Sequence, residues 1–86
     1  MLTHNALGAL ISLGAANRGE TEARAALQHR ESFVRAVAVQ LLAELRGSRP
    51  VERGLKRVRA LLVREQDRGV RSLAGRALRV LEAKRE

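Results

Sequence analysis

Apolar residues recur along the chain at the spacing of an α-helix. The stretch ESFVRAVAVQLLAEL, residues 31–45, contains a stripe of apolar residues at steps of 4, 3, 1 and 3: Val34, Ala38, Leu41, Leu42 and Leu45. Such steps place the side chains on one helical face. Comparable stripes elsewhere predict an all-α chain with five helices, at roughly residues 2–16, 20–30, 32–46, 50–65 and 68–84.

Turn and capping residues support these boundaries. The triplet Asn17-Arg18-Gly19 is typical of a turn. Ser32 and Asp67 stand where a side chain can cap the third and fifth predicted helices. Gly47 is expected to end the third helix, and Pro50 to occupy the first position of the fourth.

The chain also repeats itself. Residues 67–81, DRGVRSLAGRALRVL, match residues 31–45 at an offset of 36. An internal repeat of this length is typical of stacked helical units. A partial copy near the start, at an offset of 32, has Thr3 in place of the arginine. The matched positions are Val34 and Val70, Arg35 and Arg71, Ala38 and Ala74, Leu42 and Leu78, Leu45 and Leu81, with Ala6, Ala9, Leu10 and Leu13 in the partial copy.

In both full copies an acidic residue stands three positions before the Val-Arg pair, and a stripe of alanine and leucine follows. This pattern resembles the HEAT-like repeats of bacteria, including those seen in phycobilisome lyases. The resemblance implies a right-handed α-solenoid of about two and a half helical hairpins, forming a single domain over residues 1–86. It also implies a structural role, bridging turns and neighbouring repeats, for Glu31, Arg35, Asp67 and Arg71. A plain bundle of helical hairpins is the alternative fold.

The first predicted helix is apolar on all sides. Its inner stripe contains Ala6, Leu10 and Leu13, and a helix that is apolar all round is normally buried on both sides. We therefore expect a second copy of the chain, preceding repeats or another protein to pack on it, although deeper burial in its own core is the alternative. The expected partner interface consists of Leu7, Ile11, Gly14 and Ala15.

Positive charge is concentrated in the second half. Residues 1–47 carry 5 basic and 4 acidic side chains, whereas residues 48–86 carry 12 and 5, which gives the net charge of +8. The surplus suggests an anionic partner, with a GC-rich genome or a solvated face with ion pairs such as Glu52–Lys56 as alternatives. The candidate face consists of Arg49, Arg53, Lys56, Arg57, Arg64, Arg68, Arg76 and Arg79.

Residues for catalysis or cofactor binding are sparse. There is no cysteine, His4 and His29 are the only histidines, and Asp67 is the only aspartate. We therefore expect no enzyme, no metal, no cofactor and no small-molecule substrate. Gly54 and Gly75 are expected to let helices approach closely. No stretch has the length and apolarity of a membrane span, and no secretory signal is visible, so a cytoplasmic protein is expected.

These observations favour a non-catalytic module for protein–protein interaction, a scaffold that self-associates or packs through its first helix. The alternative is a nucleic-acid-binding protein that contacts phosphates through the basic face. Phe33 is the only aromatic residue, so recognition of single strands by base stacking is not expected. The same lack of aromatic anchors argues against a membrane partner.

Overall fold

The computed structural model describes residues 17–85, which form four helices and no strand. The prediction of an all-α protein is confirmed for this part of the chain. The predicted helix at residues 2–16 lies outside it. The helices are α2 (Glu20–Ala26), α3 (Ser32–Ala43), α4 (Ser48–Arg64) and α5 (Arg68–Ala83).

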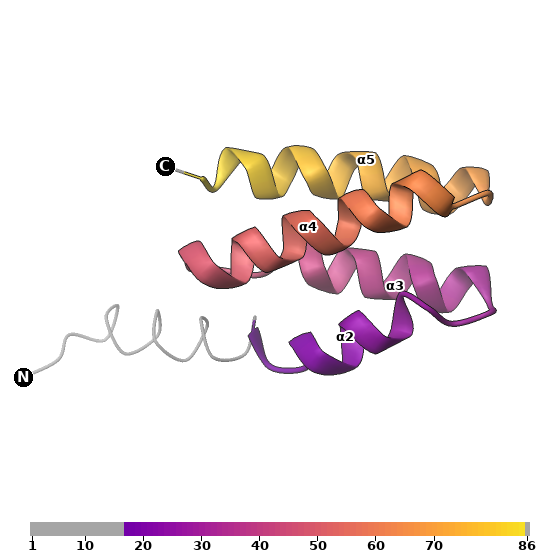
Figure 1. Cartoon of the computed structure of the whole chain (residues 1–86), viewed down its shortest axis with the longest axis horizontal. Helices are drawn as coiled ribbons and strands as arrows, with labels where there is room; N and C mark the ends of the chain where they lie inside the picture. The colour runs from indigo at the N-terminus through magenta and orange to yellow at the C-terminus, as the bar shows by residue number, and fades with distance from the viewer. Residues whose placement is uncertain (1–16, 86) are drawn as a thin grey trace, which may run out of the picture.

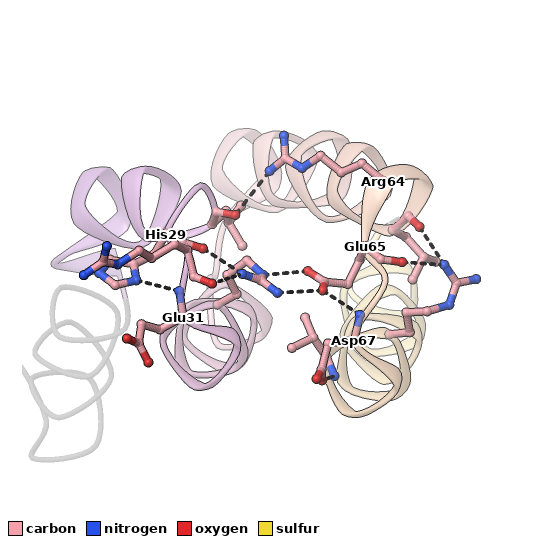
Figure 2. A network of polar contacts seen from close by, with 11 residues as sticks. His29, Glu31, Arg64, Glu65 and Asp67 are labelled. Atoms are coloured by element: carbon pink, nitrogen blue, oxygen red, sulfur yellow. Dashed lines mark hydrogen bonds and ion pairs between the residues drawn. The ribbon is translucent and has the colours of Figure 1, made fainter.

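The helices form two hairpins that lie side by side (Figure 1). Within each hairpin the two helices run in opposite directions, so α2 and α4 run one way and α3 and α5 the other. Viewed end-on in Figure 2, α2 and α4 form one row and α3 and α5 the other. Helix α3 packs on α5 and on α2, and α4 packs on α5. The arrangement therefore has two layers with a shared interior.

Aliphatic side chains fill that interior. The two repeated segments contribute matching positions, since Ala38 and Ala74 are both buried, as are Leu45 and Leu81. Burial of apolar area is the main stabilising contribution in a domain of this size. The buried apolar residues are Ala23, Leu27, Ala38, Val39, Leu42, Leu45, Val51, Leu55, Val58, Leu61, Val70, Ala74, Ala77 and Leu81.

The helix starts differ partly from the predictions. The Asp67 cap is confirmed, because its Oδ2 accepts a hydrogen bond from the Val70 N–H at 2.9 Å. The Ser32 cap is wrong: Glu31 occupies the cap position, and no side chain caps α3. Helix α4 begins at Ser48, so Pro50 is its third residue rather than its first. Its cap, Gly47, has a φ of 95°, which favours glycine.

Helix α2 is shorter than predicted. It ends at Ala26; residues 27 and 28 form a turn, and residues 29 and 30 are irregular. There the N–H groups of Gln28 and His29 donate to carbonyls three residues earlier, a tighter pattern than in an α-helix. The apolar periodicity of the sequence does not reveal where α2 ends, because Leu27 is still buried just after the helix.

The two glycines inside helices have different surroundings. A Cβ at Gly54 would lie 3.1 Å from Leu45 Cδ1 and 3.3 Å from Leu81 Cδ1, so the helices approach closely there and a larger residue would have to displace these leucine side chains. A Cβ at Gly75 would have no neighbour within 4 Å. The prediction of close helix approach is therefore confirmed at Gly54 and wrong at Gly75.

Candidate binding surfaces

A network of polar contacts joins the two hairpins at the end where α3 and α5 begin (Figure 2). Arg35 of α3 donates from Nε to Glu65 Oε1 at 2.8 Å and from Nη2 to Oε2 at 2.9 Å. Glu65 follows directly after α4, and its Oε2 also accepts the backbone N–H of Asp67 at 3.0 Å. Because the two parallel bonds fix both side chains, this pair links α3 to the turn of the next hairpin.

The repeated arginines, Arg35 and Arg71, make equivalent hydrogen bonds in the two hairpins. Arg35 Nη1 donates to the carbonyl of His29 at 2.8 Å, and Arg71 Nη1 donates to the carbonyl of Glu65 at 2.9 Å. His29 and Glu65 are 36 residues apart, so they occupy the same place in the repeat. Each arginine thus satisfies a carbonyl that the turn before its helix leaves without a backbone partner.

The acidic residues of the repeat have different surroundings. Asp67 caps α5, whereas the Glu31 carboxylate makes no hydrogen bond or ion pair within residues 17–85. The Glu31 backbone N–H donates to His29 Nδ1 at 3.0 Å. The carboxylate that binds Arg35 belongs instead to Glu65, which sequence reasoning did not single out. Its only sequence signal is its position, 36 residues after His29 and at the end of a helix.

Glu65 is held in its ionised form. Its hydrogen bonds from Arg35 lower its pKa below the usual value, burial opposes this effect, and the N–H of Asp67 lowers the pKa further. An ionised carboxylate whose oxygens already accept these bonds has no proton to donate. A hollow of about 370 Å³ lies beside the pair and is also lined by Arg30 and Arg64. Within residues 17–85, no three His, Asp or Glu side chains gather as metal ligands.

Helix α4 presents a row of cations on the side away from the core. Two of them are engaged: Arg53 binds both carboxylate oxygens of Glu20 at 2.6 and 2.9 Å, and Arg64 donates to the carbonyl of Leu27 at 3.2 Å. The hydrogen bonds from Arg53 lower the pKa of Glu20, and burial opposes this effect. The Arg53 and Arg64 contacts together fasten α4 to α2 and to the residue that follows it. The remaining three cations on this side of α4 are exposed: Arg49, Lys56 and Arg57.

Lys56 does not form the ion pair that its spacing suggests. Glu52 lies one helical turn before it, but Glu52 pairs with Arg85 at 2.6 Å. Among the residues that the structure describes, Lys56 and Arg57 have no carboxylate partner. Together with Arg53 they line an open depression of about 420 Å³ on α4. The predicted pair between Glu52 and Lys56 is therefore absent, although Arg53 of the same row does pair with a carboxylate, that of Glu20.

The α5 arginines form a separate group. Arg68, Arg76 and Arg79 are exposed on α5, on the side opposite its buried stripe. Because the buried stripes of α4 and α5 meet in one core, their opposite sides belong to different layers of the fold. The eight candidate cations therefore divide into a row of five on α4 and a group of three on α5.

A groove runs between α3 and α5 on the outside of their layer. It encloses about 430 Å³, and the apolar part of its lining comes from Ala43, Leu73, Ala77 and Val80. Glu44 and Arg76 supply one negative and one positive charge, and Gln40 a neutral polar group. The groove is thus a mainly aliphatic recess with polar groups of both signs at its border, a composition suited to contact with another polypeptide.

Helix α3 carries a second apolar surface on its other side. Phe33, Val37 and Leu41 are spaced four residues apart, and their exposed fractions are 67%, 48% and 49%. We call this surface the α3 edge. It was not predicted, because the repeat pattern assigned Leu41 to the buried stripe. The predicted interface at Leu7, Ile11, Gly14 and Ala15 lies outside the described residues.

Helices of the described region are all too short or too polar to cross a membrane. Comparisons of the chain with protein-family models, with curated proteins and with solved structures found no match.

Proposed function

We propose that the chain is a non-catalytic protein-interaction module built from HEAT-like helical hairpins. In this proposal the two described hairpins are successive units of a right-handed α-solenoid, a scaffold to which the predicted helix at residues 2–16 adds half a unit. The proposal is supported by the parallel stacking of the hairpins and by the shared contact of Arg35 and Arg71 with the turn carbonyls. Stacked units of this kind create an extended surface for partners.

The observation that carries the proposal is the groove between α3 and α5. It lies across the joint of two stacked hairpins, and its aliphatic lining is bordered by Glu44 and Arg76. A peptide or helix of a partner protein fits such a groove by burying apolar side chains between the two helices. The proposal assigns no catalytic role to Glu65 or His29, which hold the turns in place.

A site-specific photo-crosslinker tests this assignment in cells that make the protein. A benzoylphenylalanine at Gln40, in the groove, is expected to capture one defined protein, and Val80→Glu on the same chain is expected to abolish the adduct. The control places the crosslinker at Ala60, on the outer side of α4. An adduct with a second copy of the chain would identify self-association as the interaction. Equal capture at Gln40 and Ala60, or capture unchanged by Val80→Glu, would contradict the proposal.

The cation row on α4 favours a second candidate, binding to the phosphate backbone of nucleic acid. Lys56 and Arg57 are exposed beside an open depression, and within residues 17–85 neither has an ion pair that an anion there would have to replace. Contacts of this type recognise phosphates without reading bases, and they weaken steeply with salt.

Fluorescence anisotropy with a labelled DNA duplex and a structured RNA tests this candidate. Lys56→Gln with Arg57→Gln is expected to weaken binding and to reduce the salt slope by about two phosphate contacts. Arg76→Gln with Arg79→Gln on α5 is the control of equal charge change. Binding that falls equally in both variants would indicate only an effect of net charge, and the candidate would be rejected.

A further inference from the structure

The second hairpin indicates how a neighbouring helix would cover the α3 edge. At the repeat offset of 36, Val37 corresponds to Leu73 and Leu41 to Ala77. On α5 those two positions are covered: Ala77 is buried in the core, and Leu73 is half-buried against it. The side of α5 that packs on the preceding hairpin is therefore the same side that α3 leaves exposed.

The complementary side of α3 shows what a covering helix must present. The α3 side toward the core and α5 includes Val39, which is fully buried, and Ala43, which lines the α3–α5 groove. A helix that covers the α3 edge in the same way needs apolar residues at the positions equivalent to Val39 and Ala43. At the offset of 32 that relates the partial copy to the rest, those positions are Leu7 and Ile11.

The same alignment also assigns the opposite side of residues 2–16. Asn5 and Ala9 correspond to Val37 and Leu41, and Ser12 corresponds to Glu44. The segment thus combines large apolar residues at the positions that would cover α3 with small or polar residues at the positions that would remain open.

The point at which the segment joins the described chain agrees with this placement. Asn17 follows residue 16 directly, and its side-chain amide binds the backbone at the end of α3: Nδ2 donates to the Arg46 carbonyl, and Oδ1 accepts the Arg46 N–H, both at 3.0 Å. A helix that ended here and ran parallel to α3 would lie alongside it, as α3 lies alongside α5.

We propose that the α3 edge is the docking surface for residues 2–16 of the same chain, with Leu7 and Ile11 against Val37 and Leu41. This inference rests on the repeat architecture of the proposed function. It assigns Leu7 and Ile11 to an intramolecular contact rather than to a partner interface, and it leaves the groove between α3 and α5 available to a partner.

Disulfide trapping tests the contact directly, because the chain contains no cysteine of its own. The test pair is Ile11→Cys with Leu41→Cys. Its equivalent in the described hairpins, Ala43→Cys with Ala77→Cys, gives the reference rate of closure. The control pair, Asn5→Cys with Leu41→Cys, places one cysteine on the side expected to remain open. All three are oxidised in dilute solution and resolved by mass and by non-reducing electrophoresis.

We expect the test pair to form an intramolecular disulfide at a rate near that of the reference pair and roughly tenfold faster than the control. Cross-linked dimers as the main product would show that a second copy covers the α3 edge. Closure no faster than that of the control would show that residues 2–16 do not dock there. Either result would overturn the inference. Neither depends on whether the crosslinker at Gln40 captures a partner protein, so this test and the test of the proposed function can fail separately.

Discussion

Arg35 and Glu65 face each other with two parallel hydrogen bonds of 2.8 and 2.9 Å, although 30 residues of chain separate them. Arg53 and Glu20 form a pair of the same geometry between α4 and α2. The two pairs differ in burial: the exposed fraction of the carboxylate side chain is 3% for Glu65 and 12% for Glu20, and that of the arginine is 19% and 47%. Their contributions to stability should differ accordingly.

The first prediction compares the two carboxylates. Glu65→Gln should lower the free energy of unfolding by about 1–3 kcal/mol, because Arg35 loses its partner in a poorly solvated place. Glu20→Gln should cost less than about 1 kcal/mol, since water can solvate the more exposed Arg53. Urea denaturation followed by circular dichroism measures both. If Glu20→Gln lowered the free energy of unfolding more than Glu65→Gln, burial would not determine which ion pair contributes more to stability.

The second prediction concerns acid. The pKa of Glu65 lies below its ordinary value of 4.5 in the folded chain, mainly because of the hydrogen bonds from Arg35. The stabilisation is therefore complete above the unfolded pKa and is lost as the pH falls through the folded pKa. The free energy of unfolding should decline below about pH 4.5, and Glu65→Gln should reduce the steepness of that decline. Parallel curves for the two proteins would contradict the assignment.

The third prediction uses the two helical glycines. Gly54→Leu should destabilise the fold by about 1–3 kcal/mol, because the new side chain meets Leu45 and Leu81. Gly75→Leu should stabilise it by about 0.5–1 kcal/mol, because its site is open and glycine is a poor helix former. Thermal melting of the two variants measures both effects. Equal shifts of the melting temperature in the same direction would contradict the difference in packing between the two sites.

The fourth prediction concerns the helix caps. Asp67→Ala removes the acceptor of the Val70 N–H and should cost about 1 kcal/mol. Ser32→Ala should have little effect, because Ser32 is the first residue of α3 and does not cap it. Chemical denaturation under one buffer condition compares the two variants. Comparable losses would mean that Ser32 contributes a contact beyond the helix start.

Local chemistry explains what the sequence could predict. The Asp67 cap and the start of α5 follow from interactions within three residues, which a linear pattern records. The buried stripe follows likewise, since Ala38 and Ala74 share one repeat position and one environment. All-α architecture could be predicted for the same reason, because each amphipathic segment buries its own face.

Contacts between hairpins could not be predicted in this way. The partner of Arg35 comes from a turn 30 residues away. The sequence around Glu31 also does not indicate that its carboxylate makes no ion pair within residues 17–85. The pairing of Glu52 with Arg85 rather than Lys56 likewise depends on how α5 lies against α4. The same holds for the exposed α3 edge, since periodicity identifies apolar positions but not the neighbour that covers them.

Lys84, near the end of α5, gives the joint between the hairpins a mechanical property. Its Nζ donates to the carbonyls of Ala43 and Leu45 at 2.7 and 2.8 Å, at the end of α3 opposite to the Arg35–Glu65 pair. Helix α3 is therefore joined to the second hairpin at both ends, by Glu65 in the turn before α5 and by Lys84 just after α5, and sliding of one hairpin past the other would break one of these contacts. A stack joined in this way should resist torsion, so we expect the width of the α3–α5 groove to be set by the fold itself.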